Sequence, residues 1–130
     1  MKSRNRSMSS TSDRFRTVYF DAFQDWAVSK SSEKDIKDPL HRMTHGATGL
    51  AGEAGEALEI VKKIKYGKQP LNDDRREHFK KELGDALWYI AEAAKGAGFL
   101  LSEVAEANVE KLEARYPDGF DTDRMTENKD

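Results

Sequence analysis

The sequence contains no cysteine. This absence excludes disulfide bonds, thiolate metal sites and a cysteine nucleophile, and it fits a reducing compartment, so we expect a cytoplasmic protein. No apolar run approaches the length that crosses a membrane. The opening residues, MKSRNRSMSSTS, are basic and rich in serine, and they lack the apolar stretch of a secretory signal peptide. We therefore expect no membrane partner.

A large excess of charge of either sign is also missing, because the formal net charge is -2 over 130 residues. Such a balance creates no field that would attract nucleic acid, and we expect no nucleic-acid partner. The length suits one domain, and 37% hydrophobic with 35% charged residues is typical of a small helical protein. We expect that domain over residues 13–121, a disordered basic tail over 1–12 and a flexible tail over 122–130.

Apolar residues recur at three- and four-residue spacing in four segments, and no segment alternates as a strand would. The spacing predicts helices over about residues 13–29, 42–65, 73–95 and 102–116. Asp73 or Asp74 is expected to open the third helix, and Ser102 to cap the fourth. Short connections predict antiparallel neighbours, so the expected fold class is all-α, a domain like a four-helix bundle.

Two acidic pairs stand on neighbouring predicted helices. Glu53 and Glu56 form E-x-x-E, and after 25 intervening residues Glu82 and Asp85 form E-x-x-D. On a helical wheel Glu53 falls inside the apolar stripe of its helix, and the second pair borders the apolar face of the next helix. Most such pairs are solvated or bound to lysine. Carboxylates facing one another at the edge of a core need cations or protons, however, so the four together favour a metal site.

Oxygen ligands alone favour magnesium, manganese or calcium over zinc or copper. A di-iron bundle would carry E-x-x-H on its helices, and the sequence has no such motif. Magnesium keeps water ligands and shares its coordination shell with phosphate oxygens. The pattern therefore predicts a magnesium site, with manganese as the alternative ion, that is suited to phosphoryl chemistry.

Two further features have more than one interpretation. Glycine recurs every third residue in the second helix (Gly46, Gly49, Gly52 and Gly55), which fits either close helix packing or room for a bulky ligand. On the fourth helix an amide, an ammonium and a guanidinium share one side (Asn108, Lys111 and Arg115). These groups would either hold phosphate oxygens or pair with the carboxylates.

With these residues assembled, the sequence resembles the MazG-like all-α nucleoside triphosphate pyrophosphohydrolases. The resembling stretch begins at GLAGEAGE (49–56), continues through KELGDALWY (81–89) and ends with EANVEKLEARYPDGF (106–120). The resemblance implies that the catalytic carboxylates, which also hold magnesium, are Glu53, Glu56, Glu82 and Asp85. It implies that Lys111 and Arg115 contact the substrate triphosphate, with Asn108 nearby. It also implies a homodimer or homotetramer.

The expected reaction is magnesium-dependent hydrolysis of nucleoside or deoxynucleoside triphosphates to the monophosphate and pyrophosphate. A water would attack the α-phosphorus, and Glu53 or Glu56 would orient that water or take its proton. A narrower enzyme for dUTP, dCTP or phosphoribosyl-ATP would have the same architecture. A different class is a non-catalytic helical module whose acidic stripes bind a basic partner.

The preferred base depends on a pocket that the pattern does not define. Trp26, Trp88 and Tyr89 would either pack in the core or line that pocket. His45, near the start of the second helix, is either a structural histidine or a group that approaches the substrate.

Overall fold

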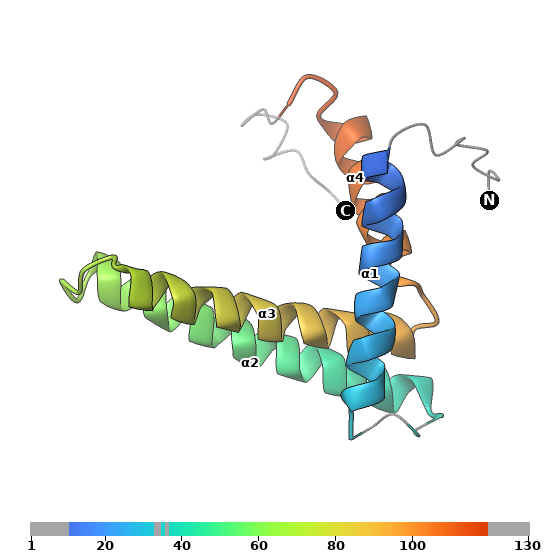
Figure 1. The fold of residues 1–130 in the computed structure, drawn as a ribbon, viewed down its shortest axis with the longest axis horizontal. Helices are drawn as coiled ribbons and strands as arrows, with labels where there is room; N and C mark the ends of the chain where they lie inside the picture. The colour runs from blue at the N-terminus through green and yellow to red at the C-terminus, as the bar shows by residue number, and fades with distance from the viewer. Residues whose placement is uncertain (1–10, 33–34, 36, 120–130) are drawn as a thin grey trace.

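The computed structural model describes residues 11–32, 35 and 37–119, and within them it contains four helices and no strand (Figure 1). The helices are α1 (Thr11–Lys30), α2 (Pro39–Lys65), α3 (Asp73–Gly96) and α4 (Leu101–Arg115). The predicted all-α class is confirmed. Apart from residues 11 and 12, which belong to α1, the two expected tails lie outside the described residues. None of the helices in the described part is both long and apolar enough to cross a membrane.

The helix α2 begins three residues before the predicted start at Arg42. Asp38 caps it, because its side chain accepts a hydrogen bond from the Leu40 amide at 3.0 Å. Pro39 follows at a first-turn position where its missing N–H costs nothing. The apolar pattern did not reveal this start, since a cap and a proline carry no periodicity.

The helix α3 begins at Asp73 as predicted, but neither aspartate caps it. Asn72 is the cap, and its side-chain oxygen accepts from the Arg75 amide at 3.0 Å. Asp73 and Asp74 instead occupy the first turn, where negative charge is favourable beside the positive end of the helix dipole.

The prediction that Ser102 caps α4 is wrong. The cap position is Leu100, and Ser102 is already the second helical residue. A carboxylate of α1 replaces the local cap: Asp21 Oδ1 accepts from the Ser102 amide at 3.0 Å, and Oδ2 accepts from the Ser102 hydroxyl at 2.8 Å. The start of α4 therefore depends on a residue from the other end of the chain.

The four helices form two pairs that cross. The helices α2 and α3 make a long antiparallel hairpin and are the most closely packed pair, whereas α1 and α4 stand across one end of it (Figure 1). α1 contacts α3 and α4, and α4 contacts α3 close to that end. The opposite half of the hairpin extends beyond this crossing, so neither α1 nor α4 covers it in the described part of the chain.

The core lies where α1, α3 and α4 meet. Ala27, Ala91 and Leu101 are buried there, and they are surrounded by partly buried side chains: Phe20, Phe23, Trp88 and Ile90. Gln24 links the elements, since its amide donates to the Phe99 carbonyl at 2.9 Å and its oxygen accepts from the Leu101 amide at 3.1 Å. The hydrophobic centre is thus at one end of the hairpin.

The apolar spacing of α4 predicts a buried face made of Leu101, Val104, Ala105, Val109 and Leu112. Of these residues Leu101 is buried, and Ala105 and Leu112 are half-buried. Val104 and Val109 are exposed, and so is Asn108, which the pattern placed in the middle of that face. The reason is the crossing arrangement, because α4 leaves the hairpin after its first turns and then has only α1 beside it among the described helices (Figure 1).

The glycines of α2 divide into two classes. A Cβ at Gly46 would lie 2.6 Å from the Ala93 backbone nitrogen, and a Cβ at Gly49 would collide with the Tyr89 ring. Close packing of α2 on α3 therefore accounts for these two glycines. A Cβ at Gly52 or Gly55 would meet nothing within 4 Å, so packing within the chain does not require glycine there.

One buried ion pair joins the beginning of α2 to the end of α3. Arg42 Nη1 donates to Glu92 Oε2 at 2.8 Å, and the exposed fractions of the two side chains are 5% and 0%. The second oxygen, Glu92 Oε1, is buried and has no hydrogen-bond partner among the described residues. Burial without full satisfaction makes this pair sensitive to the loss of either member.

Candidate functional site

The hairpin brings three of the four predicted carboxylates together. Glu53 of α2 lies opposite Glu82 and Asp85 of α3, and one oxygen from each lies within 4.8 Å of the others. Glu53 and Glu82 are half-buried, and Asp85 is exposed. The group sits along the middle of the hairpin, where the 3-4 spacing of each helix turns these positions toward its neighbour.

Glu56, the fourth predicted carboxylate, is exposed and lies outside this group of three. It is one turn beyond Glu53 on α2, and its charge contributes to raising the pKa of Glu53. The structure therefore places Glu56 beside the cluster and leaves its side chain directed toward solvent.

The environment raises the pKa of Glu53 above the ordinary value of 4.5. The largest cause is a side-chain hydrogen bond with Glu82, which a proton on Glu53 can donate. Desolvation acts in the same direction, as does repulsion from Asp85, Glu82 and Glu56. The site resists full ionisation in the absence of a cation.

His78 extends the site along α3. Its Nε2 lies 3.1 Å from Glu82 Oε1, one helical turn away. The Glu82 side chain is 15% exposed and that of His78 is 61% exposed, so the imidazole covers the outer side of the carboxylate. A hydrogen bond of this kind holds a carboxylate in one orientation.

The donor chemistry fits a hard divalent ion. Three carboxylates supply oxygen atoms only, at a separation that ion coordination can bridge, and no histidine nitrogen belongs to the group. Magnesium and manganese prefer oxygen ligands of this type. The raised pKa of Glu53 points the same way, because a nearby cation would relieve the repulsion that causes it.

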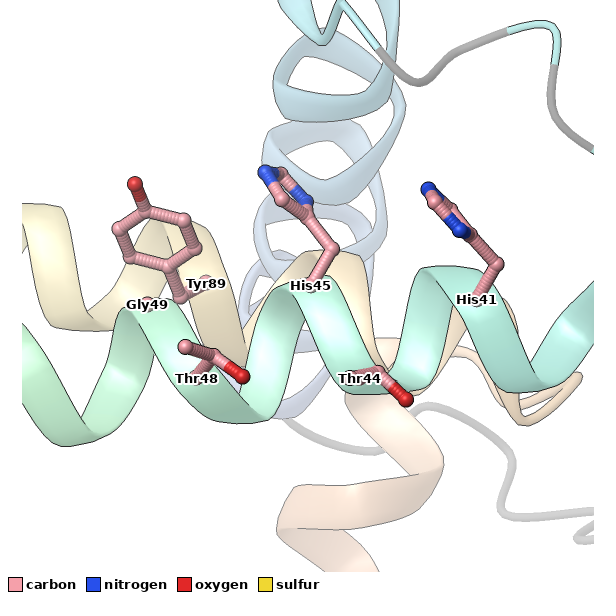
Figure 2. Close-up of a pocket in the computed structure, with 6 residues that line it drawn as sticks. All are labelled: His41, Thr44, His45, Thr48, Gly49 and Tyr89. Carbon is pink, nitrogen blue, oxygen red and sulfur yellow. The ribbon is translucent and has the colours of Figure 1, made fainter.

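A cavity of about 410 Å³ lies one turn from the carboxylates, toward the crossing end of the hairpin. Its lining comes from His41, Thr44, His45, Thr48, Gly49 and Tyr89 (Figure 2). The His45 and Tyr89 rings stand side by side with centroids 5.7 Å apart, and Tyr89 lies over Gly49. Apolar walls with a few polar groups suit a planar organic ligand. We call this cavity the ring pocket.

His45 supplies a polar atom that the fold leaves unused. Its Nδ1 is buried and has no hydrogen-bond partner among the described residues. Buried polar atoms normally have partners, so an unpaired one at a cavity indicates a missing ligand or water. This observation favours the substrate-approaching interpretation of His45 over the purely structural one.

From the sequence, Trp26, Trp88 and Tyr89 could either pack in the core or line a pocket, and the structure places them differently. Tyr89 lines the ring pocket. Trp88 packs against the hydrophobic core and makes an edge contact with the Tyr89 ring at 5.1 Å between centroids. Trp26 is exposed and contacts Phe23 at a centroid distance of 5.9 Å. Of the three, only Tyr89 lies at the site.

The polar residues of α4 are not gathered at the carboxylates within one chain. Asn108 and Lys111 are exposed and Arg115 is half-buried, with its guanidinium 5.7 Å from the centre of the Tyr116 ring. The C-terminal half of α4, which carries them, rises away from the hairpin (Figure 1).

The part of the chain that carries the acidic residues is similar to known proteins. The model of the MazG nucleotide pyrophosphohydrolase domain matches residues 43–120, which include the four acidic positions and all of α3 and α4. The chain is also similar to the Gene 37 protein of Mycobacterium phage L5, with 36% identity over 83 residues, covering 63% of this chain and 73% of that protein. No solved structure matches it. The facing acidic helices and the extent of the match agree: the chain belongs to the MazG nucleotide pyrophosphohydrolase domain family.

Proposed function

We propose that the protein hydrolyses nucleoside or deoxynucleoside triphosphates to the monophosphate and pyrophosphate with magnesium, or alternatively manganese. The observation that carries the proposal is the cluster of Glu53, Glu82 and Asp85 across the α2–α3 hairpin, which raises the pKa of Glu53. Such a cluster is costly in isolation and becomes favourable with a divalent ion and a polyphosphate.

The ring pocket supports the nucleotide part of this proposal. Tyr89 and His45 lie beside each other there, and Gly49 and Tyr89 are each one turn from a carboxylate of the cluster. We assign this pocket to the nucleoside, with the base against the Tyr89 ring and the unpaired His45 Nδ1 as a hydrogen-bonding group. The α-phosphate would then lie at the carboxylates.

The chemistry follows from that orientation. Glu53, Glu56, Glu82 and Asp85 would hold the divalent ion, which supplies charge neutralisation and a more acidic bound water. A water oxygen forms a bond to the α-phosphorus while the bond from that phosphorus to the bridging oxygen of the β-phosphate breaks. Glu53 or Glu56 takes the proton of the water, and the bridging oxygen leaves with pyrophosphate.

Charge on the phosphates also requires cations from the protein, and we assign Lys111 and Arg115 to this role, with Asn108 nearby. Because the far half of α4 rises away from its own hairpin, we propose that these groups reach the carboxylates of a second copy in a homodimer or homotetramer. The uncovered half of the hairpin is the surface available for that contact.

Product analysis tests the proposal. The full chain is incubated with each common nucleoside triphosphate and magnesium, and pyrophosphate and orthophosphate are measured separately. We expect pyrophosphate and monophosphate in equal amounts, and loss of both with Glu82→Gln. Orthophosphate with a nucleoside diphosphate would show cleavage at a different bond and overturn the proposal.

A further inference from the structure

One flank of the α2–α3 hairpin carries a continuous row of functional side chains. On α3 the row is spaced alternately by three and four residues, which keeps it on one face: Arg75, His78, Glu82, Asp85 and Tyr89. On α2 the side chains of His45, Glu56 and Lys63 fall within about 20° of one another on a helical wheel. Since the helices are antiparallel, the two rows run beside each other in matching order.

The row ends in a second cavity at the closed end of the hairpin, which we call the hairpin-end pocket. Its volume is about 360 Å³, within the usual range for ligand sites. Its lining comes from Ile60, Lys63, Gln69, Asn72, Asp74, Arg75 and His78. Two permanent cations and one carboxylate, Asp74, therefore face this space, and the balance favours an anion.

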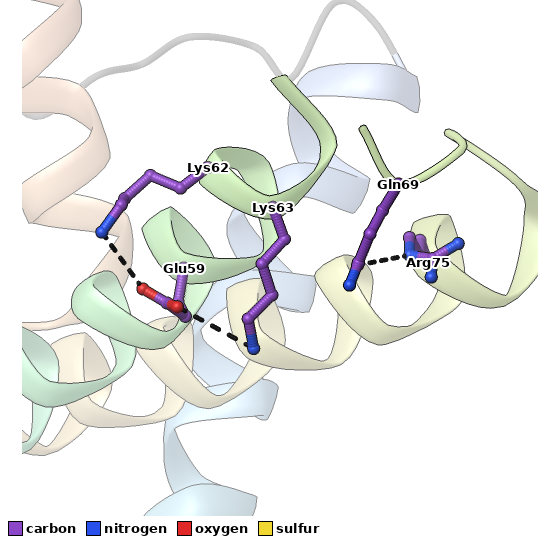
Figure 3. Close-up of polar contacts among 5 residues, drawn as sticks. All are labelled: Glu59, Lys62, Lys63, Gln69 and Arg75. Carbon is purple, nitrogen blue, oxygen red and sulfur yellow. Dashed lines mark hydrogen bonds and ion pairs between the residues drawn. The ribbon is translucent and has the colours of Figure 1, made fainter. Parts of the chain in front are cut away.

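Arg75 is held in place at this pocket. Its Nε donates to Gln69 Oε1 at 3.0 Å (Figure 3). Its Nη1 donates to the Pro70 carbonyl at 3.0 Å. These bonds use two of the five N–H groups of a guanidinium. A cation fixed in this way loses little conformational freedom when it binds a phosphate.

Lys63 is held more loosely than Arg75. Its Nζ lies 3.8 Å from Glu59 Oε1, while Lys62 Nζ lies 3.5 Å from the other oxygen of the same carboxylate (Figure 3). Exposed pairs of this kind are weak. Lys63 can therefore turn to an anion in the pocket while Lys62 remains beside Glu59.

His78 connects the hairpin-end pocket to the carboxylates. It lines the pocket, and its Nε2 lies 3.1 Å from Glu82 Oε1. Along the axis of α3, Arg75 is about 10 Å from Glu82 and His78 about 6 Å. A phosphate chain that begins at the carboxylates would extend past His78 into this pocket.

We propose that the hairpin-end pocket, through Lys63 and Arg75, binds the terminal phosphate of the triphosphate and retains pyrophosphate after cleavage. This inference rests on the proposed function and adds to it the place of the leaving group. Nucleoside, carboxylates and terminal phosphate would then occupy three successive stretches of one groove, the ring pocket being the first.

Calorimetry on the full chain tests this inference with inorganic pyrophosphate and, separately, a nucleoside monophosphate, both with magnesium. Lys63→Gln and Arg75→Gln are each expected to weaken pyrophosphate binding about tenfold or more, as the loss of a charged contact does. Monophosphate binding should stay within about twofold, because it does not use the pocket.

Two neighbouring residues provide matched controls. Lys62→Gln and Arg76→Gln remove the same charges outside the hairpin-end pocket, because neither Lys62 nor Arg76 lines it. Both controls should bind pyrophosphate within about twofold of the unaltered chain. Equal weakening by pocket and control variants would mean that net charge alone is responsible, and it would overturn the inference.

The remaining outcomes are also decisive. No pyrophosphate binding by the unaltered chain, or unchanged binding by Lys63→Gln, would overturn the inference. Lys63 lies on an exposed helical surface. The result for Lys63→Gln therefore does not depend on the α2–α3 connection, to which Arg75 is hydrogen-bonded. If the chain cleaves no triphosphate, the proposed function fails, while the comparison of pyrophosphate affinities still decides whether this pocket binds phosphates.

Discussion

At the scale of single residues, the surroundings of Glu53 give the most direct sign of a ligand site. It lies on the apolar stripe of α2, hydrogen-bonds with Glu82 and is surrounded by like charge, so the pKa of its carboxyl is raised. A solvated glutamate would have none of these features. Either a proton on Glu53 or a positively charged ligand offsets the cost of this placement.

The raised pKa of Glu53 predicts a pH-dependent difference in stability between the unaltered chain and Glu53→Gln. The folded state holds the Glu53 proton more tightly than the unfolded state, so the stabilisation is complete below the unfolded pKa near 4.5 and is lost as pH rises through the raised value. Melting temperatures in a chelator, from about pH 4 to about pH 8, should show the unaltered chain losing stability relative to Glu53→Gln.

Glu77→Gln is a control, because its effect on stability should depend on pH in the opposite direction. A hydrogen bond from Lys80 lowers the pKa of Glu77, so its small contribution is present at higher pH and is lost as pH falls through the lowered value. A Glu53→Gln curve parallel to that of the unaltered chain would contradict the prediction.

The Arg42–Glu92 pair predicts a large effect from a residue away from the carboxylates. Arg42→Met leaves the Glu92 carboxylate buried without its cation, and we expect a loss of about 3–5 kcal/mol in the free energy of unfolding. The double variant Arg42→Met/Glu92→Leu should recover most of it. Urea denaturation measures both.

Arg76→Met provides the comparison, because its pair with Asp73 is exposed and should contribute at most about 1 kcal/mol. Similar losses for Arg42→Met and Arg76→Met would show that the buried pair has no special weight.

At the scale of the helices, the start of α4 depends on α1. Asp21→Ala removes both hydrogen bonds to Ser102 and should cost about 1–2 kcal/mol of stability, as the loss of a helix cap does. Asp25→Ala, one turn further along α1 at an exposed position, should change stability by less than about 0.5 kcal/mol. Thermal unfolding compares the two, and equal shifts would contradict the role of Asp21.

Helix identity followed from the sequence because periodicity is a local property. The facing of Glu53 with Glu82 and Asp85 was also predictable, since it requires only two antiparallel helices with the acidic pairs at matching heights. The metal-binding and catalytic roles of these carboxylates remain predictions.

What the sequence could not provide depended on distant contacts. The Asp21 cap on Ser102 joins residues 81 positions apart, and the exposure of Val109 depends on how α4 crosses the hairpin. The ring pocket required the close approach of Gly49 to Tyr89. In the sequence, only the position of His45, two turns before Glu53 on α2, pointed to this pocket, and such a spacing is not specific for a ligand site.

At the scale of the whole molecule, the hairpin has an uncovered apolar flank opposite its functional row. Leu58 and Val61 of α2 are 59% and 41% exposed, and Leu83 and Leu87 of α3 are 50% and 37% exposed. On the wheel of α2, Val61 lies about 80° to one side of Glu53 and Lys63 about 80° to the other. Exposed apolar side chains on one flank favour association with a second copy.

Sedimentation should therefore show a homo-oligomer for the unaltered chain and a shift toward monomer for Leu83→Glu. The added carboxylate would be desolvated in the contact, which disfavours assembly. Lys81→Glu, an exposed position about 160° from Leu83 on the wheel of α3, adds more negative charge and should leave the assembly unchanged. A monomeric unaltered chain at micromolar concentration would contradict the prediction.

Assembly also makes a prediction about the active site. If Arg115 of one copy acts on the carboxylates of another, Glu53→Gln and Arg115→Gln should each be inactive alone and recover activity when mixed. In a two-fold dimer with random exchange, about one quarter of the sites would be intact. No recovery after verified subunit exchange would place both residues in the same copy.

The separation of the core from the carboxylates has a consequence for how this protein can change. Ala27, Ala91 and Leu101 maintain the fold where α1, α3 and α4 meet, whereas Glu53 and Glu82 lie further along the α2–α3 hairpin. Substitutions along the rest of the hairpin are therefore expected to change ligand preference with little effect on the packing that keeps the chain folded. New substrate preferences can arise on this scaffold through small surface changes, with little penalty for the stability of the centre.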